Sequence, residues 1–108
     1  MLRMRIEWSH RALDDLSDIL KYVIDTFGET AAYHVNNEIN DDVDKLAFFP
    51  QLGRIYYHDT ESGITYRALT SKYHKILYYS KGDVLKVVLL WNTRRDNNEL
   101  TRQLKLIN

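Results

Sequence analysis

Pro50 is the only proline, and it separates a part of the chain with helical periodicity from a part with strand-like patterns. A proline cannot continue a helix, and it biases the preceding residue, here Phe49, away from helical backbone angles. Between Ser9 and Pro50 apolar residues recur every three or four positions, whereas after Gly63 they form short runs rich in β-branched and aromatic residues. This separation of helices from most strands favours an α+β fold over an alternating βαβ fold.

Two amphipathic helices are predicted between Ser9 and Pro50. Ser9 is a candidate N-cap because its hydroxyl can accept from a free N–H of the first turn, and Gly28 is placed to end that helix. The second helix begins near Glu29 or Thr30, so the connection is short and predicts an antiparallel helical hairpin. The apolar stripes consist of Ala12, Leu13, Leu16, Ile19, Leu20, Val23 and Phe27 in the first helix and Ala32, Val35, Ile39, Val43 and Leu46 in the second.

Strands are predicted at the N-terminus and after the helices. The first eight residues alternate apolar and charged side chains, which is typical of a strand with one buried face. The later strands are expected at Ile64–Ser71, Tyr73–Ser80 and Val84–Trp91, and Gln51–Gly63 is expected to be a loop. Because Val84–Trp91 is apolar at nearly every position except Lys86, it should lie inside the sheet with both faces covered.

A single α+β domain over residues 1–108 follows from these patterns. It has an N-terminal strand, an antiparallel helical hairpin, a three-strand antiparallel meander that completes one sheet, and a short C-terminal helix. Asp96 and Glu99 match a capping box at the start of that last helix. The hairpin should cover one sheet face, leaving part of the other for the terminal helix or a partner.

Composition narrows the class of protein further. The chain has no cysteine, so disulfides and thiolate metal sites are excluded. No apolar run approaches the roughly 18 residues of a membrane span, and the N-terminus lacks the apolar core of a signal peptide. We expect a soluble, cytoplasmic protein without membrane association.

The formal net charge of zero hides a segregation of charge along the chain. Residues 7–44 contain ten acidic and two basic residues, whereas residues 45–108 contain eleven basic and five acidic residues. Such a chain can present a basic face to an anionic partner although its net charge is zero. Alternatively, acidic helices and basic strands neutralise each other across the fold.

Familiar catalytic and ligand-binding patterns are absent from the sequence. The four glycines are scattered and form no phosphate-binding loop. The four histidines show no metal-ligand spacing, and the acids at positions 41, 42 and 44 lack the glycine and terminal glutamate of a calcium loop. We expect no metal and no cofactor.

Basic and aromatic residues alternate in the part of the chain predicted to be β. Cations can bind phosphates and aromatic rings can stack on bases, so this pattern suits nucleic-acid binding. Basic residues and tyrosines whose pKa values are suitably shifted can also cleave RNA without a metal. The alternative is structural, because tyrosines are common in half-buried strands and basic residues on polar faces aid solubility. The candidate residues for target or nucleic-acid binding are Arg54, Arg67, Lys75, Arg94 and Arg95.

Four successive stretches resemble the RelE/ParE superfamily of toxins from bacterial type II toxin–antitoxin systems. They are IEWSHRALDDLSDILKYV, FPQLGR, the pair ITYRAL and YHKILYY, and VVLLWNTRRD, and the resemblance they mark out extends over nearly the whole chain. The resemblance implies a growth-arresting toxin that a cognate antitoxin neutralises. Its target would be DNA gyrase, as for ParE-like members, or ribosome-bound mRNA, as for RelE-like members that cut mRNA without a metal. A homodimer, or a heterotetramer with the antitoxin, is compatible with this resemblance.

RelE-like enzymes often carry a tyrosine or histidine near the C-terminus as a proton donor or acceptor. This chain has no tyrosine after Tyr79 and no histidine after His74, so the comparison favours a ParE-like gyrase poison. If the protein is instead an endoribonuclease, the candidate catalytic residues are Arg67, Lys75, Tyr78 and Arg95, with Tyr73 or His74 as substitute proton donors. A third alternative is an inactive family member that only binds its antitoxin.

Overall fold

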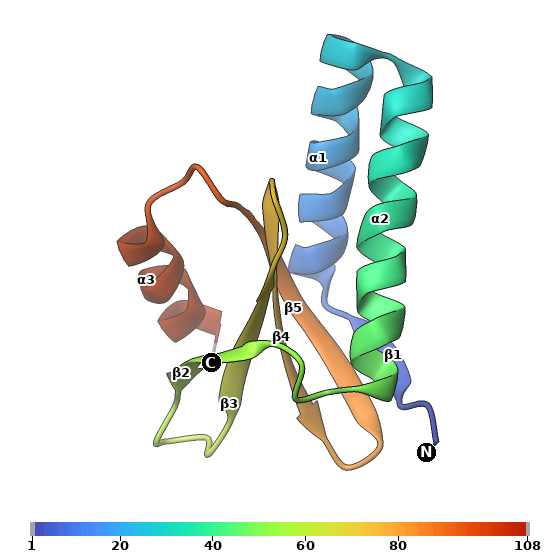
Figure 1. The fold of residues 1–108 in the computed structure, drawn as a ribbon. Coiled ribbons are helices and arrows are strands. Elements are labelled where there is room, and N and C mark those ends of the chain that lie inside the picture. Colours follow the sequence, from blue (N-terminus) through green and yellow to red (C-terminus); the bar gives the residue numbers. More distant parts are fainter. Residues whose placement is uncertain (1, 108) are drawn as a thin grey trace.

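The computed structural model describes residues 2–107, in which two helices precede a block of strands and a third helix ends the chain (Figure 1). Along the chain the elements are β1 (Arg5–Trp8), α1 (His10–Phe27), α2 (Glu29–Phe48), β2 (Arg54–His58), β3 (Thr65–Thr70), β4 (His74–Lys81), β5 (Val84–Asn92) and α3 (Asn97–Ile107). The predicted α+β class is therefore confirmed, and the predicted elements occur in the predicted order, with β2 as an additional strand. Within residues 2–107 no helix is both long and apolar enough to cross a membrane.

The strands form one mixed sheet in the order β1-β5-β4-β3-β2. β1 runs parallel to β5, and the other three pairings are antiparallel, so the meander has four strands and not three. The prediction of a loop over Gln51–Gly63 is wrong for Arg54–His58, which forms edge strand β2. A bulge between Ile55 and Tyr57 interrupts the alternation of β2, so its sequence lacks the period-two pattern that identifies a strand.

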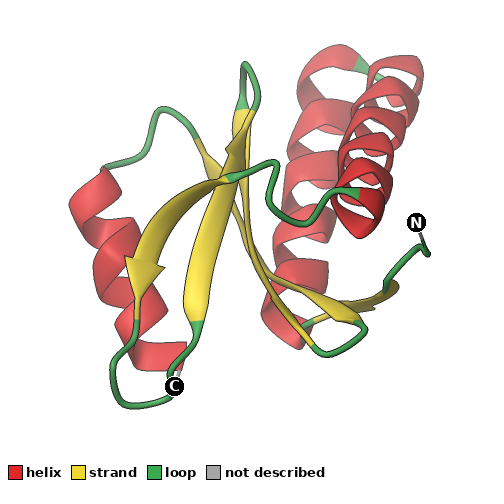
Figure 2. Ribbon diagram, turned by 60° about the horizontal axis from the view of Figure 1, so that its bottom comes forward, coloured by secondary structure: helices red, strands yellow, loops and turns green. Residues whose placement is uncertain are grey.

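The helical hairpin, α1 with α2, begins and turns where its sequence predicts. Ser9 caps α1 by accepting a hydrogen bond from Ala12 N at 2.9 Å, and its own hydroxyl donates to Val88 O in β5. Gly28 joins the helices with a φ of 96°, a backbone conformation that side-chain-bearing residues rarely adopt. The hairpin packs on one side of the sheet and α3 on the other (Figure 2).

β5 contributes to two apolar clusters, one on each sheet face. Leu85, Val87 and Leu90 pack with the helical hairpin, whereas Leu89 and Trp91 pack with α3. The pairing of β4 with β5 shifts register between Leu77 and Tyr78, which pair with Leu89 and Val87. Val88 therefore has no partner in β4, and this extra residue changes which positions of β5 face each side of the sheet. The prediction that this strand is covered on both faces is confirmed, because the helical hairpin packs on one face and α3 on the other.

α1 also covers the edge of β5 beyond the end of β1. The last β1–β5 pair is Trp8 with Val87, so β5 continues past the strand that borders it. There Asp15 of α1 accepts a hydrogen bond from Leu90 N at 3.0 Å, and Arg11 holds the Asp15 carboxylate at 2.9 Å. Side chains of α1 thus satisfy backbone groups of β5 that would otherwise lack a strand partner.

Candidate functional site: a cationic rim beside α3

Few ion pairs join the acidic and basic parts of the chain within residues 2–107. Within residues 2–107, only two lysines or arginines after position 44 lie within ion-pair distance of a carboxylate: Lys86, which contacts Glu7, and Arg102, which contacts Glu99. The remaining lysines and arginines of this segment have no described carboxylate within ion-pair distance, and they are Lys45, Arg54, Arg67, Lys72, Lys75, Lys81, Arg94, Arg95 and Lys105. Their positive charge is therefore available to an anionic partner.

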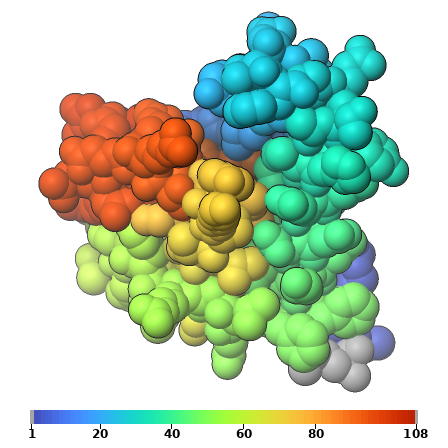
Figure 3. Space-filling view, turned by 45° about the horizontal axis from the view of Figure 1, so that its top comes forward, coloured from blue at the N-terminus to red at the C-terminus, as the bar shows by residue number. Residues whose placement is uncertain are grey.

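Two turns bring several of these cations together. In the turn between β5 and α3, Thr93 donates its N–H to Tyr73 O at 3.1 Å and its hydroxyl to Lys72 O at 3.2 Å. These bonds fasten this turn, which carries Arg94 and Arg95, to the turn between β3 and β4. Figure 3 shows the β3–β4 turn, in yellow, between α3 in orange-red and the helical hairpin in blue to green.

Arg95 is held in place by an aromatic ring. Its guanidinium carbon lies 3.7 Å from the centroid of the Trp91 ring, and Trp91 itself is fully buried. Stacking of a guanidinium on an indole is attractive and also fixes the direction of the cation. Arg94 is exposed, and its backbone N–H donates to Asn92 Oδ1 at 2.8 Å. The two arginines thus lie in the turn that follows the end of β5.

Lys75 extends this group of cations across the sheet. It is the register partner of Trp91, its Nζ donates to Asn97 Oδ1 at 2.7 Å, and it lies 6.0 Å from the Tyr56 ring centroid. An open cavity of about 410 Å³ is lined by both Lys75 and Arg54. We refer to Arg54, Lys72, Lys75, Arg94 and Arg95 as the cationic rim.

The start of α3 borders the cationic rim and is capped by one half of the predicted capping box. Asp96 Oδ1 accepts from Asn98 N at 2.9 Å, as expected of a cap. Glu99 does not return a bond to the cap, because its carboxylate is engaged by Arg102 and Gln103. Those donors lower the pKa of Glu99, with Gln103 the larger cause.

Arg67 and Tyr78, the other two candidate catalytic residues, lie together and bind the loop that leads into β2. Arg67 Nη1 donates to Gly53 O at 2.8 Å. The Tyr78 hydroxyl donates to Pro50 O and accepts from Gly53 N, both at 2.8 Å. Tyr78 is fully buried, and burial raises the pKa of its phenol. We refer to these bonds as the loop clamp.

The two substitute proton donors also occupy different environments. Tyr73 is exposed on the β3–β4 turn, with Lys72 Nζ 5.2 Å from its ring centroid. His74 is buried, and its Nε2 lies 3.7 Å from Asp42 Oδ2, which is beyond hydrogen-bond distance. Desolvation outweighs the attraction of Asp42 and lowers the pKa of His74. Among residues 2–107 no three histidine, aspartate or glutamate side chains are grouped to hold a metal ion.

Sequence reasoning missed three residues at the cationic rim: Tyr56, Lys72 and Asn97. The Tyr56 hydroxyl lies 3.1 Å from both Asn97 O and Thr101 Oγ1, beside Lys75. The sequence places Tyr56 in a predicted loop, and its pattern gives no sign that the side chain contacts a lysine of a strand. Lys72 follows Ser71 in a predicted turn beside the candidate strands, and that position was the one available signal.

The family model described as "ParE toxin of type II toxin-antitoxin system, parDE" matches residues 6–97. The chain belongs to the ParE toxin family. A solved structure described as "Chromosomal ParDE TA system from P. aeruginosa" is similar in fold, with a TM-score of 0.66 and 18% sequence identity, covering 83% of this chain and 96% of that chain. Comparison with curated proteins finds no match. Membership of the ParE family confirms the predicted RelE/ParE resemblance and identifies a type II toxin–antitoxin toxin.

Proposed function

We propose that this ParE-family toxin arrests growth by poisoning DNA gyrase and that a cognate antitoxin neutralises it. The observation that carries this proposal is the family match over residues 6–97, which spans the hairpin and all of the sheet except its first residue, Arg5. The same function places the protein in the cytoplasm, where gyrase acts on the chromosome.

The cationic rim is the surface that we propose contacts the target. None of its cations forms an ion pair with a carboxylate of the described residues, and Arg95 is already ordered by Trp91. An ordered arginine loses less side-chain entropy on binding than a freely rotating one. We propose that Arg67 does not contact the target itself but helps to position Arg54, because its guanidinium binds the backbone of the loop that leads into Arg54.

Purified protein added to a gyrase supercoiling assay tests the target directly. The wild type should inhibit supercoiling and trap cleaved DNA, and the double variant Lys75→Gln/Arg95→Gln should require about tenfold more protein for the same effect. Lys45→Gln is the matched control, because Lys45 is an exposed cation without a carboxylate partner outside the rim. No inhibition by the wild type would refute the gyrase proposal, and equal potency of the double variant would refute the assignment of the rim.

The antitoxin we propose carries an acidic, amphipathic segment that covers the cationic rim. Co-expression with the product of an adjacent small reading frame should restore growth and yield a stable complex. Its mass, measured by light scattering, would distinguish a simple heterodimer from a heterotetramer. Restored growth without complex formation would contradict direct neutralisation.

Ribosome-dependent mRNA cleavage is the second candidate, and Tyr56 is the observation that favours it. Its phenol lies at the cationic rim, so a tyrosine is present beside Lys75 although the C-terminal segment supplies none. A translating-ribosome cleavage assay run beside the gyrase assay separates the two functions. If the protein cleaves mRNA, Tyr56→Phe should abolish that cleavage. If the protein is a gyrase poison, the same variant should inhibit gyrase as strongly as the wild type.

A further inference from the structure

A row of side chains crosses the sheet on the face against which α3 packs. The strand register pairs Thr70 of β3 with Lys75 of β4, and Lys75 with Trp91 of β5. Paired residues point to the same face of a sheet, and here this is the α3 face, because Trp91 belongs to the apolar cluster that contains the buried leucines of α3. Arg54 of β2 joins the same face, since its partner Ala68 belongs to that cluster. The row lies at the end of the sheet nearest the β3–β4 turn.

Short side chains leave a hollow within this row. The open cavity of about 410 Å³ that Arg54 and Lys75 line is what we call the rim hollow. Its other lining residues are Leu52, Gly53, Ile55, Tyr56, Ala68, Leu69 and Thr70, and none of these described residues carries a carboxylate. Because β3 lies between β2 and β4, the two long basic side chains stand on either side of the short Ala68 and Thr70.

Hydrogen-bond donors that line the rim hollow are mostly unused. Among residues 2–107, the Arg54 guanidinium and the Thr70 hydroxyl have no hydrogen-bond partner. Lys75 Nζ donates to Asn97 Oδ1 at 2.7 Å, and an ammonium group has three N–H donors, so two remain. Two cations and a hydroxyl without a carboxylate beside them favour an anion with several acceptor oxygens, such as phosphate.

The row of cations continues beyond the rim hollow to Arg95. Its guanidinium stacks on Trp91, the register partner of Lys75. From β2 to β5 the row crosses three inter-strand spacings of about 4.8 Å each, or roughly 14 Å. Along one strand of a DNA duplex a phosphate recurs about every 3.4 Å of helix axis. A row of this length therefore matches a repeating polyanion better than it matches a single acidic side chain.

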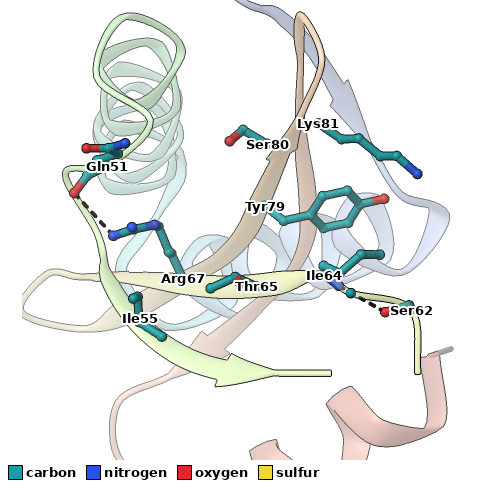
Figure 4. A pocket seen from close by; sticks show the side chains of 10 residues that line it. Gln51, Ile55, Ser62, Ile64, Thr65, Arg67, Tyr79, Ser80 and Lys81 are labelled. Atoms are coloured by element: carbon teal, nitrogen blue, oxygen red, sulfur yellow. Dashed lines mark hydrogen bonds between the residues drawn. The ribbon is translucent and has the colours of Figure 1, made fainter. Parts of the chain in front are cut away.

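The other open cavity, of about 400 Å³, lacks this convergence of cations. Figure 4 shows Arg67 directed toward the Gln51 backbone and the Lys81 side chain pointing away from Arg67. Arg67 pairs with Tyr78, which packs in the cluster of the helical hairpin, so Arg67 lies on the opposite face from Lys75. Lys81 shares both strand and face with Lys75 but does not line the rim hollow, which makes it a matched control.

We propose that the cationic rim contacts the backbone of the DNA that gyrase holds, with one phosphate bound in the rim hollow by Arg54, Thr70 and Lys75. This inference rests on the proposed gyrase target and names the part of the gyrase complex that the toxin recognises. Phosphate contacts carry no sequence information, so binding does not depend on base sequence. An acidic antitoxin segment on the same cations would compete with the DNA.

Fluorescence anisotropy of a short labelled DNA duplex, titrated with the full-length toxin, tests this contact without gyrase. The wild type should bind saturably, with a dissociation constant of about 1–100 µM at physiological salt, and a duplex of scrambled sequence should bind equally. Arg54→Gln should weaken binding several-fold and reduce the slope of log affinity against log salt by about one. Thr70→Val should weaken binding without changing that slope, because it removes a hydroxyl and no charge. Lys81→Gln should match the wild type.

Three results would overturn the proposed DNA contact. They are the absence of saturable binding, an unchanged salt slope in Arg54→Gln, and a loss of affinity in Lys81→Gln equal to that in Arg54→Gln, which would indicate general attraction to basic residues. Tighter binding of single-stranded RNA than of the duplex would overturn it in favour of an mRNA target. Binding of a glutamate-rich peptide without binding of DNA would overturn it in favour of an acidic protein surface.

The supercoiling assay separates failure of this inference from failure of the proposed target. Inhibition of gyrase by a toxin that does not bind DNA would refute the phosphate site and leave gyrase as the target. DNA binding at the rim hollow without inhibition of gyrase would refute the target and support the phosphate site. If both hold, Arg54→Gln should lose potency against gyrase in parallel with its loss of DNA affinity, and Lys81→Gln should keep both.

Discussion

The loop clamp makes Tyr78→Phe a sharp test of how the loop before β2 is held. This substitution removes one oxygen from a fully buried ring and leaves the ring volume almost unchanged. Two hydrogen bonds of 2.8 Å are lost, and Gly53 N and Pro50 O lose their partner. A net hydrogen bond contributes about 0.5–1.5 kcal/mol, and a buried unsatisfied group costs about 1–3 kcal/mol. We therefore expect the free energy of unfolding to fall by about 2–3 kcal/mol.

Urea denaturation followed by circular dichroism measures this loss. The midpoint concentration should fall while the slope of the transition stays constant, because the surface exposed on unfolding hardly changes. The thermal midpoint should fall by roughly 10 °C for a domain of about 100 residues. Tyr73→Phe is the matched control, since Tyr73 is 58% exposed and its hydroxyl bonds to no described residue. A loss below about 0.5 kcal/mol in Tyr78→Phe would show that the clamp does not hold the loop.

Alkaline titration gives a second, independent measure of the same hydroxyl. Burial raises the folded-state pKa of Tyr78 above the ordinary value of 10.0. Folding therefore favours the protonated phenol, so its stabilising contribution is present below pH 10 and is lost as the pH rises through the raised pKa. The wild type should lose stability above pH 10 more steeply than Tyr78→Phe. Parallel curves for the two proteins would contradict a buried, protonated hydroxyl.

Three further outcomes follow from other contacts. Asp15→Ala should cost about 1–3 kcal/mol in urea denaturation, because it leaves Leu90 N without an acceptor; a neutral effect would mean that water replaces the carboxylate. His74 has a pKa below the ordinary 6.5, so stability should fall as the pH drops below 6.5, and His74→Gln should flatten that fall; an unchanged pH profile would contradict the buried neutral imidazole. Gly53→Ala should be strongly destabilising, because a Cβ there would lie 2.6 Å from the Tyr78 hydroxyl; wild-type stability would show that the loop shifts easily.

Local sequence patterns predicted the helical hairpin and the buried strand well. Ser9, Gly28 and the apolar stripe of α1 act within a few residues of one another, so their spacing carries the information. The edge strand was missed because β2 is stabilised by pairing with β3 and α3 and not by its own alternation. Tyr56, for example, contacts Asn97 and Thr101, more than forty positions along the chain.

The candidate residues could be chosen from the sequence but not sorted between the two surfaces. Arg67 and Lys75 look alike as strand cations, yet their partners differ: Arg67 pairs with Tyr78 at the loop clamp and Lys75 with Trp91 at the cationic rim. Which face a strand residue occupies depends on register, and a single bulge such as Val88 reverses it. Stacking of Arg95 on Trp91 likewise depends on the turn that follows β5.

The side chains with which α1 covers the edge of β5 limit how this sheet can grow. A strand's unpaired backbone groups are a template for another chain, and three stretches of this sheet border no further strand: β1, β2 and the end of β5. Ser9 and Asp15 occupy backbone groups on the third of these. β1 has four residues, which leaves the five residues of β2 as the longer template. A chain that extends the sheet, whether a partner or an aggregating copy, would therefore be expected to do so through β2.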